Sequence, residues 1–382
     1  MLTTTYHDLH ATMTRGHASD PADADGELTA RYQRLIKSKY FPWTVHSHFQ
    51  RRLGSGGQGI VFLTEHRGAE GFTVPVAVKV FAPERYDDAR GYDEAMLRIA
   101  HVSALVARIQ QDNLLTVLNF VDYDRIRMML MEWVDGFDLR RLLCKETLAR
   151  VKPRVSVRRW EYINNVIATS GPEQTRFKPG VAVAIMRECL MALAALHREN
   201  IIHRDIKPSN IMLKRTGNAK IIDIGSAFEM DNPPPIRTCT PFYAAPEVLD
   251  GGEMTPRSDL ASLGYVLIEL LSGRQPFAGM KTCRELLEAK RALPQQLSKI
   301  LPAEVTCNEL LMNFCKGLIA PDPQVRFPDA EAATMLKVGA AAFLAQLVKG
   351  DMSSEYENEI RLLIEELKEL SEAAGDIEPP TV

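Results

Sequence analysis

The segment HRDIKPSNIML, residues 203–213, restricts the chemistry of this chain more than any other part of the sequence. It places an acid (Asp205), a base (Lys207) and an amide (Asn210) in one short loop, and Pro208 fixes the turn between them. A purely structural loop has little reason to combine these three groups so closely. A carboxylate for a hydroxyl proton, a cation for a phosphoryl group and an oxygen ligand for a metal are what phosphoryl transfer requires.

A further acid follows an apolar run in KIIDIG, residues 220–225. Asp223 comes directly after Ile221 and Ile222, which is typical of the first turn residue after a buried strand. The same carboxylate can also be a metal ligand, because Mg²⁺ prefers oxygen ligands. The local pattern leaves both interpretations open.

A glycine-rich stretch, LGSGGQGIV (residues 53–61), lies between two predicted strands. Gly54, Gly56 and Gly59 lack side chains, so backbone N–H groups there can approach phosphate oxygens. Alone, the G-x-G-x-x-G pattern is weak evidence, since plain hairpins also carry it. The strand VFLTEH follows it in place of a helix, which argues against a dinucleotide-binding fold.

Lys79 stands in the next predicted strand, VAVKV. Its simplest interpretation is a lysine that points to solvent. Because side chains two residues apart share one face of a strand, Lys79 can instead face the same cleft as Ala77.

The chain divides into a part rich in strand signals and a part rich in helix signals. From residue 48 to about 134, short β-branched runs alternate with turn residues, with one helical stretch at about 92–110. After residue 180, apolar residues recur at helical spacing, as in VAVAIMRECLMALAALHREN. This order predicts an α+β fold with a cleft where the two parts meet, near residues 132–136.

Composition argues against several classes of protein. The net charge of −3 lacks the basic excess of nucleic-acid binders, so we expect no nucleic-acid partner. Six scattered cysteines without a C-x-x-C pair argue against zinc and for a reducing compartment. The polar N-terminus does not resemble a signal peptide, and the most apolar stretch, residues 338–348, is too short to span a membrane as a helix. We therefore expect a cytoplasmic protein without a membrane span.

Two stretches near the centre and the start of the chain are expected to be additions to the core. Residues 1–47 are polar and rich in small residues, so we expect a partly disordered N-terminal extension. Residues 145–178 carry eight Lys or Arg against three Glu. This basic insertion is either a solvated surface segment or a docking site for an acidic partner or a phosphate group.

Residues 346–382 are expected to form an amphipathic helix and a tail. Their apolar residues repeat with heptad spacing amid Glu and Lys; they are Tyr356, Ile360, Leu363, Leu367 and Leu370. Such a short stripe packs against its own domain more often than it dimerises. A dimer or a docked partner through residues 355–371 is the alternative.

Taken together, the motifs resemble those of eukaryotic-type (Hanks-type) protein serine/threonine kinases over about residues 48–345. The matching pieces occur in the family's order: GSGGQG, VAVK, HRDIKPSN, DIG, APE and the late arginine of DPQVRF. One such piece arises easily by chance, whereas six in order do not. The resemblance implies a two-lobed kinase fold, with an N-lobe at 48–134 and a C-lobe at 135–345. It also suggests a divergent, bacterial branch of the family.

The resemblance also implies a role for individual positions. Asp205 is implied as the catalytic base, with Lys207 beside the γ-phosphate and Lys79 on the α- and β-phosphates of ATP. Mg²⁺ is implied to bind Asn210 and Asp223. The residues implied to surround ATP are Leu53, Gly54, Gly56, Gly59, Val61, Ala77, Lys79, Glu132, Val134 and Met212.

We therefore predict a kinase that transfers the γ-phosphate of ATP to Ser and Thr hydroxyls of protein substrates. Ile224 stands where the family usually has Phe, but it is another large hydrophobic residue and does not by itself silence the site. The first alternative is a pseudokinase that acts as a nucleotide-binding scaffold. The second is a small-molecule phosphotransferase, against which the Lys207–Pro208 pair and the AAPE segment argue.

The expected glutamate partner of Lys79 is the weakest part of the resemblance. Counting back from QDNLLTV by the family's usual interval lands near His101 and Val102, and neither is acidic. Glu94 is the best available acid, although it lies about two helical turns too early. Either the helix or its following loop is lengthened and Glu94 pairs with Lys79, or the pair is missing or its acid comes from elsewhere. Without a partner, Lys79 would be poorly positioned.

Further expectations concern the segment between DIG and APE. By resemblance, Thr240 contacts the catalytic aspartate, Glu247 pairs with Arg326, and Asp259 braces the catalytic loop. Thr238 is the candidate for phosphorylation. The alternative is that the PPP run fixes this segment without phosphorylation.

Overall fold

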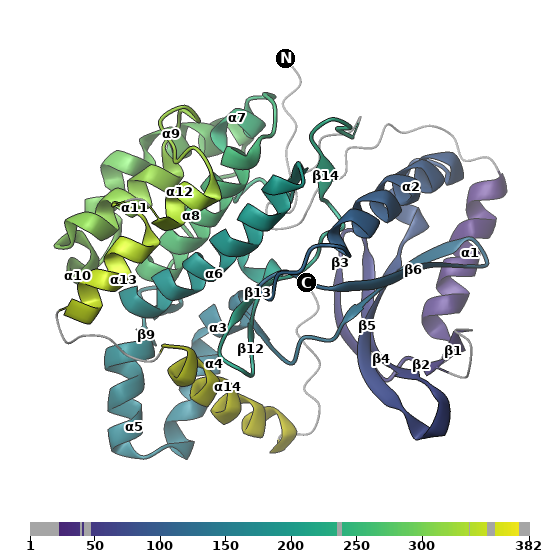
Figure 1. The fold of residues 1–382 in the computed structure, drawn as a ribbon, viewed down its shortest axis with the longest axis horizontal. Coiled ribbons are helices and arrows are strands. Elements are labelled where there is room, and N and C mark those ends of the chain that lie inside the picture. Colours follow the sequence, from purple (N-terminus) through teal and green to yellow (C-terminus); the bar gives the residue numbers. More distant parts are fainter. Residues whose placement is uncertain are drawn as a thin grey trace.

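The chain folds into a small lobe built on a β-sheet and a larger helical lobe (Figure 1). The computed structural model describes residues 23–38, 40–41, 47–234, 239–335, 337–349 and 356–373. The predicted α+β, two-lobed architecture is confirmed.

The small lobe contains a five-stranded antiparallel sheet in the order β3-β4-β5-β7-β6. Its strands are β3 (Arg51–Gly56), β4 (Gly59–Arg67), β5 (Thr73–Phe81), β6 (Val117–Tyr123) and β7 (Ile126–Glu132), preceded by the short pair β1 (Tyr40–Phe41) and β2 (Ser47–His48). The β-branched run of β5 lies at the centre of the sheet and is buried from Val76 onwards, as the packing of such residues on a pleated surface favours.

The register of this sheet brings the predicted nucleotide-binding residues onto one face. Val61 of β4 lies opposite Lys79 of β5, and Ala77 lies opposite Met131 of β7. Since opposite residues share a face, as do residues two apart on one strand, Val61, Ala77 and Lys79 line the same side.

Helices α1 (Asp23–Lys37) and α2 (Ala89–Val106) pack in the small lobe (Figure 1). The apolar face of α1 buries Leu28, Tyr32 and Leu35, so this part of the N-terminal extension docks on the lobe. The first 22 residues lie outside the described part. Asp88 caps α2 by accepting a hydrogen bond from the backbone N–H of Gly91 at 2.6 Å.

The large lobe is organised around two buried helices, α6 (Pro179–Arg198) and α8 (Pro256–Ser272). Both are apolar on nearly every side, as helices in the centre of a bundle are. The other helices are α3 (Leu139–Leu143), α7 (Pro246–Leu249), α9 (Cys283–Ile300), α10 (Ala303–Thr306), α11 (Glu309–Ile319), α12 (Ala330–Met335) and α13 (Ala340–Lys349). The short strands are β8 (Gly136–Asp138), β11 (Ile201–Ile202), β12 (Ile211–Lys214), β13 (Ala219–Ile221) and β14 (Phe228–Glu229).

Burial explains the apolar sequence of α6. By length and composition α6 could cross a membrane, and so could residues 330–348, but most of α6 is buried inside the large lobe. The second stretch is divided into α12 and α13, with a turn at Lys337 and Val338.

The basic insertion is a folded part of the large lobe. It contains α4 (Lys145–Val151), α5 (Val157–Tyr162), a helical turn at Ile163–Ile167 and the hairpin of β9 (Ala168–Ser170) and β10 (Thr175–Phe177). The hairpin docks on the end of α8, where the backbone N–H of Gln174 donates to the carbonyl oxygen of Gly273 at 2.9 Å.

The C-terminal helix α14 (Tyr356–Ala373) packs on α4, α6 and β12 of the same chain (Figure 1). Ile360, Leu363 and Leu367 are almost completely buried there. The apolar stripe therefore packs on its own domain, and these three side chains are not available for a dimeric coiled coil.

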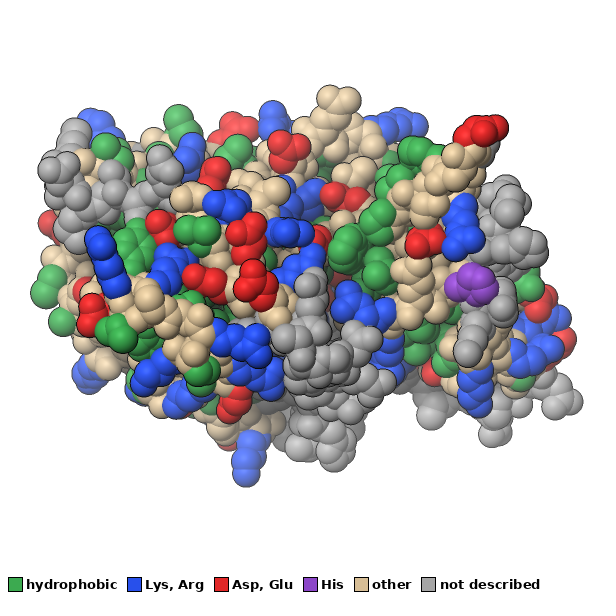
Figure 2. All heavy atoms as spheres, turned by 90° about the horizontal axis from the view of Figure 1, so that it is seen from below, with side chains coloured by type: hydrophobic (Ala, Val, Ile, Leu, Met, Phe, Trp, Pro, Cys, Tyr) green, Lys and Arg blue, Asp and Glu red, His purple; other side chains and the backbone are tan. Residues whose placement is uncertain are grey.

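Part of the basic insertion finds its acidic partner within the chain. Arg159 of α5 pairs with Glu359 at 2.9 Å and with Glu366 at 2.8 Å, both on α14. Arg176 and Lys178 both pair with Glu304. Seen from below, blue and red side chains are intermixed on this face (Figure 2), as expected for charges that are paired locally.

Candidate active site

The predicted catalytic loop, residues 203–210, lies between β11 and β12 and is held by a buried acid of α8. Asp259 is 1% exposed, and its carboxylate accepts backbone N–H bonds from His203 and Arg204, both at 2.9 Å. The imidazole Nε2 of His197 lies 2.9 Å from the same carboxylate. Arg204 has a φ of +72°, so the loop contains a strained residue that Asp259 fixes in place. The expected brace is present.

Asp205 lies at the centre of a network of hydrogen bonds. Its Oδ1 accepts from the hydroxyl of Thr240 at 2.6 Å, and its Oδ2 accepts from Asn210 Nδ2 and Lys207 Nζ, both at 2.9 Å. Burial alone would raise the pKa of Asp205, but Lys207 and Thr240 outweigh it and lower the pKa. The carboxylate is therefore an ionised acceptor of low basicity, suited to orienting a hydroxyl group more than to removing its proton early.

Asn210 and Asp223 are brought together by the β12–β13 hairpin. The backbone N–H of Ile222 donates to the carbonyl oxygen of Asn210 at 2.8 Å, which places the following residue, Asp223, beside Asn210. Asn210 Nδ2 donates to the backbone oxygen and to Oδ2 of Asp205. Its nitrogen side is thereby fixed, and its carbonyl oxygen is the atom with which it can bind a cation.

This donor set fits Mg²⁺. Mg²⁺ typically takes one or two protein oxygens and completes its shell with phosphate oxygens and water. No cluster of three or more His, Cys, Asp or Glu that could hold a metal exists among the described residues. Asn210 and Asp223 are therefore suited to a metal that arrives with a phosphorylated ligand.

Lys79 is 5% exposed, and its ammonium group contacts two oxygens. Its Nζ lies 2.5 Å from Oδ1 of Asp223 and 2.7 Å from Oε1 of Gln58. Burial alone would raise the pKa of Asp223, but Lys79 and the N–H of Gly225 lower it to about 2.

The structure does not bring Glu94 to Lys79. Glu94 lies on the exposed side of α2 and pairs with Arg90 one turn earlier, at 2.9 Å. Asp93, the other acid of α2, pairs with Arg125 and Arg127. The physical reason is the register of α2, which begins at Ala89 and presents both acids away from the cleft.

Positions 101 and 102, where the family's usual spacing places the glutamate, carry other side chains. Val102 is buried in the core, and His101 pairs with Glu229 of β14 at 2.9 Å. The expected Lys–Glu pair from α2 is thus absent among the described residues.

Gln58 is the site residue that the sequence did not single out. Besides accepting from Lys79, it donates from Nε2 to the hydroxyl of Ser226 at 3.0 Å. A Cβ atom at Gly225 would lie 2.3 Å from Gln58 Oε1, so the glycine makes room for this side chain. In the sequence, Gln58 is recognisable only as a long polar residue within the glycine-rich stretch. The G-x-G-x-x-G motif does not specify a residue type at this position, so it predicts no role for Gln58.

The glycines of this stretch differ in what requires them. A Cβ at Gly59 would lie 1.9 Å from the carbonyl oxygen of Val80, so packing of the sheet requires glycine there. A Cβ at Gly54 or Gly56 would meet nothing within 4 Å. Since no packing demands glycine at these two positions, close approach of a ligand is a better reason for them.

The remaining predicted nucleotide contacts come from both lobes. Leu53 and Val61 come from β3 and β4, and Met212 comes from β12 in the large lobe. After β7 the chain passes from Glu132 to Val134 into the large lobe. The Glu132 side chain accepts from the backbone N–H of Thr116 at 2.6 Å and from Lys220 at 2.5 Å, which leaves the expected adenine contact to its backbone.

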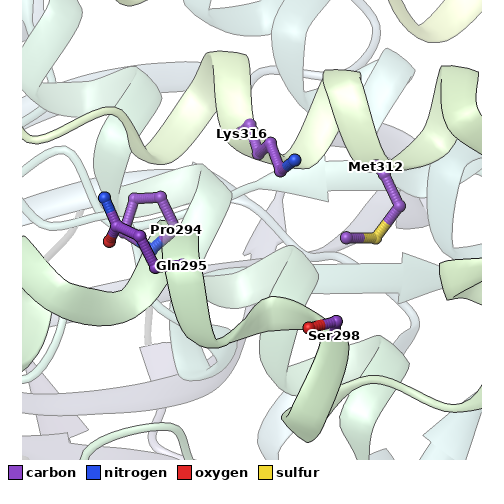
Figure 3. A pocket seen from close by; sticks show the side chains of 5 residues that line it. All are labelled: Pro294, Gln295, Ser298, Met312 and Lys316. Carbon is purple, nitrogen blue, oxygen red and sulfur yellow. The ribbon is translucent and has the colours of Figure 1, made fainter.

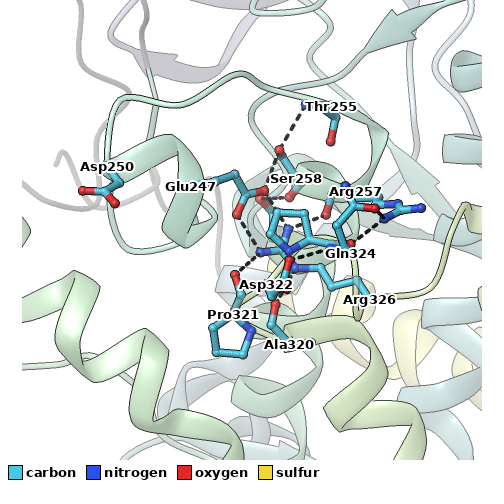
Figure 4. A network of polar contacts seen from close by, with 12 residues as sticks. Glu247, Asp250, Thr255, Arg257, Ser258, Ala320, Pro321, Asp322, Gln324 and Arg326 are labelled. Carbon is cyan, nitrogen blue, oxygen red and sulfur yellow. Dashed lines mark hydrogen bonds and ion pairs between the residues drawn. The ribbon is translucent and has the colours of Figure 1, made fainter.

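The segment after Asp223 is anchored at its far end. Glu247 and Arg326 form a bidentate ion pair with both distances at 2.6 Å (Figure 4), and the Arg326 side chain is fully buried. Ser258 also donates to Glu247 at 2.9 Å. Thr238, the predicted phosphorylation site, lies outside the described residues.

Surface hollows elsewhere do not compete with this site. One of about 330 Å³ lies between α9 and α11 and is lined by Pro294, Gln295, Ser298, Met312 and Lys316 (Figure 3). Another of about 300 Å³ lies beside Glu247 and Arg257. Neither is lined by a residue of the catalytic loop or the glycine-rich stretch.

Comparison with known proteins identifies a family. Residues 47–337 match the protein kinase domain. The chain is 27% identical over 330 residues to serine/threonine-protein kinase PrkC of Bacillus subtilis, covering 85% of this chain and 43% of PrkC. It is 28% identical over 282 residues to serine/threonine-protein kinase PkaA of Streptomyces coelicolor, covering 70% and 45%. It is 30% identical over 250 residues to serine/threonine-protein kinase PknL of Mycobacterium tuberculosis, covering 64% and 52%. The chain spans about half the length of these relatives.

Proposed function

The chain belongs to the protein kinase family, since its kinase domain covers residues 47–337, and from this premise we propose that it is an active protein serine/threonine kinase. The observation that carries the proposal is the continuous set of polar contacts from Thr240 through Asp205 and Asn210 to the Asp223 loop. The relatives named above as serine/threonine-protein kinases support the same activity.

In the proposed reaction, ATP is the phosphoryl donor. The acceptor hydroxyl oxygen forms a bond to the γ-phosphorus as the bond to the leaving ADP oxygen breaks, and the hydroxyl proton passes to Asp205. Lys207, which lies 2.9 Å from Asp205 and 3.2 Å from Thr240, offers positive charge beside the transferred group. Asn210 and Asp223 would hold Mg²⁺, which neutralises phosphate charge when bound.

The low pKa of Asp205 is compatible with this chemistry. The phosphoryl-transfer transition state is loose, so the hydroxyl proton leaves late and a strong base is not required. What the site must provide is position and charge, and the carboxylate has both of its oxygens fixed by hydrogen bonds.

Non-catalytic nucleotide binding is the second candidate function, and one observation favours it. Lys79 binds Asp223 at 2.5 Å and has no acid from α2 to hold it elsewhere. If this ion pair persisted with nucleotide bound, Asp223 would be less available to a metal. Against this candidate, Lys79, Asp205, Asn210 and Asp223 are all present.

The proposal extends to substrate class and location. We propose Ser and Thr hydroxyls in proteins as acceptors, with the segment around Thr240 as the platform for the acceptor peptide. A cytoplasmic location, where ATP and reduced thiols are available, remains a prediction, as does a docked protein partner at the unpaired part of the basic insertion.

The proposal is tested by incubating the protein with γ-labelled ATP, Mg²⁺ and a general acceptor such as myelin basic protein. Label on phosphoserine and phosphothreonine, and none after chelation of the metal, is expected. Label only on phosphotyrosine or on a small molecule would contradict the proposed substrate class.

A further inference from the structure

Lys290 of α9 is a buried lysine that the proposed chemistry does not use. Its side chain has no exposed surface. Two further lysines are buried in the described part of the chain, Lys79 and Lys220, and each pairs with a carboxylate at 2.5 Å. Lys290 pairs with no carboxylate among the described residues. A lysine is rarely fully buried unless it is paired, so this one needs another explanation.

The surroundings of Lys290 are mainly aromatic, with one backbone oxygen as hydrogen-bond acceptor and the Cys239 thiol close enough to interact electrostatically. Its Nζ lies 3.8 Å from the ring centre of Tyr265 and 4.0 Å from that of Phe277, and the two rings meet edge to face. It donates a hydrogen bond of 2.6 Å to the carbonyl oxygen of Phe242. Burial lowers the pKa of Lys290 well below its ordinary value, while the two ring faces favour whatever positive charge remains.

Phe242 belongs to the segment that runs beside the catalytic base. In this segment, Thr240 donates to Asp205 at 2.6 Å and Tyr243 donates to Glu269 of α8 at 2.7 Å. Between these two residues in the sequence, Lys290 donates to the backbone carbonyl oxygen of Phe242. We name residues 240–243, which lie beside Asp205 through this Thr240 contact, the acceptor platform.

Packing alone does not explain a lysine at this position. Transferring an amine from water to an apolar site is costly, and a methionine of similar length would fill the same space without that cost. What methionine cannot supply is the N–H donor for the Phe242 carbonyl oxygen, which would otherwise lose its contact with α9.

We propose that Lys290 is a positioning residue that fixes the acceptor platform from α9 and thereby sets the affinity for the acceptor peptide. Its action is indirect, since it touches the backbone of Phe242 and neither Asp205 nor the nucleotide-binding residues. As a role in acceptor binding, the inference rests on the proposed kinase function.

The first test measures the platform itself and does not need activity. Hydrogen–deuterium exchange is followed at residues 239–245 in the wild type, in Lys290→Met and in Lys299→Met, an exposed lysine of the same helix. We expect exchange in this segment to rise about tenfold in Lys290→Met alone, as loss of one hydrogen bond allows. Because the variant also removes a buried amine, its Tm should fall little. Unchanged exchange would overturn the proposal.

The second test separates acceptor binding from nucleotide binding. Lys290→Met is expected to raise the KM for an acceptor peptide about tenfold and to leave the KM for ATP unchanged. Lys290→Gln, which keeps an N–H donor, should recover part of the peptide KM. An equal rise in the KM for peptide and the KM for ATP, or unfolding of both variants, would show that Lys290 only supports the core. Either result would overturn the proposal.

The two failures can be distinguished. If the wild type transfers no phosphate, the proposed function fails, while the exchange experiment still decides the role of Lys290. If the wild type is active and Lys290→Met has an unchanged peptide KM, only the inference about Lys290 fails.

Discussion

The ammonium group of Lys79 is shared between a charged oxygen of Asp223 and a neutral oxygen of Gln58. In the family pattern, an acid from the neighbouring helix holds the lysine away from the metal-binding acid. Here a side chain of the glycine-rich stretch offers the competing oxygen. We therefore expect the Gln58 oxygen to compete with Asp223 for the Lys79 ammonium group.

Replacing Gln58 by Met tests this view. The variant keeps the length of the side chain and removes its acceptor oxygen, so Lys79 should move wholly to Asp223. We expect the KM for ATP to rise about threefold to tenfold, as loss of one charge-assisted hydrogen bond allows. The exposed Gln295→Met is the matched control. Tighter ATP binding in Gln58→Met would show instead that Gln58 competes with the nucleotide.

A second prediction at this scale concerns acid stability. The pKa of Asp223 is lowered to about 2 by Lys79, so its ionised form stabilises the fold above its ordinary pKa of 3.8 and loses this effect as the pH falls toward 2. In Lys79→Met, burial without the ammonium should raise the pKa of Asp223 instead. The loss of unfolding free energy in Lys79→Met should therefore be constant from pH 6 to 8 and smaller at pH 4.

Urea unfolding of both proteins at these pH values makes the comparison. Because 35% of the Asp223 side chain is exposed, solvent screens the pair and the difference should be modest. A difference that grows as the pH falls would contradict the assignment of Lys79 as the group that lowers the pKa of Asp223.

Among the secondary-structure elements, α14 joins distant parts of the large lobe. It is held at α5 by Arg159, and its Lys368 pairs at 2.6 Å with Asp135, just after the chain leaves the small lobe. The Lys368 ammonium also lies 6.0 Å from the ring centre of Trp133. This helix thus connects the basic insertion to the short segment, residues 133–135, that links β7 to β8.

Charge reversal at Arg159 tests how α14 is held. Arg159→Glu places a third carboxylate beside Glu359 and Glu366, which lie largely buried with it. We expect a loss of about 2–4 kcal/mol in unfolding free energy, from two broken ion pairs and the new repulsion. Arg158→Glu, at the exposed neighbour, should cost less than about 0.5 kcal/mol. Equal losses in the two variants would contradict a specific contact; denaturant unfolding measures both.

For individual helices, the sequence predicts which face is buried but not which elements that face packs against. The heptad stripe identified the buried Ile360, Leu363 and Leu367 of α14, because a 3.5-residue period depends only on local sequence, but it missed the equally buried Ile364. It did not identify α4, α6 and β12 as the surface beneath, because that depends on how the chain returns. In the same way, the excess of positive charge in residues 145–178 was visible, whereas its pairing with α14 and Glu304 was not.

At the scale of the whole molecule, the ion pair of Glu247 and Arg326 anchors the end of the segment that follows Asp223 to the rest of the large lobe. It joins residues 79 positions apart, and Arg326 also donates to the carbonyl oxygens of Ala320, Arg257 and Pro321 (Figure 4). Of these contacts, only the pair with Glu247 requires the segment to be docked.

Removing Arg326 should therefore destabilise the protein strongly. In Arg326→Met, Glu247 loses its ion pair and keeps only the Ser258 hydroxyl, while three carbonyl oxygens lose the Arg326 donor, and we expect a loss of about 3–5 kcal/mol. Arg326→Lys should recover little, because an ammonium cannot reproduce the bidentate pair. Thermal unfolding measures both. A loss below about 1 kcal/mol in Arg326→Met would show that the network does not stabilise the fold.

For the whole molecule, the order of motifs was enough to predict the family and the two lobes. The loop around Asp205 could be predicted because its residues act within one short segment. The partner of Lys79 could not be predicted, because it depends on the register of α2 and on Gln58, which is 21 positions away in the sequence. Lys290 gave no signal either, since a lysine in an amphipathic helix is usually at the surface.

The central claim is that this site transfers phosphate and does not only bind nucleotide. It is tested most directly by measuring ATP affinity and phosphoryl transfer together, in the wild type and in Asp205→Asn, with the same Mg²⁺ concentration. The account predicts similar ATP affinity in the two proteins and transfer that is slower by about 10²–10⁴-fold in Asp205→Asn, as removal of a catalytic base allows. ATP binding without transfer in either protein would contradict it and identify a pseudokinase.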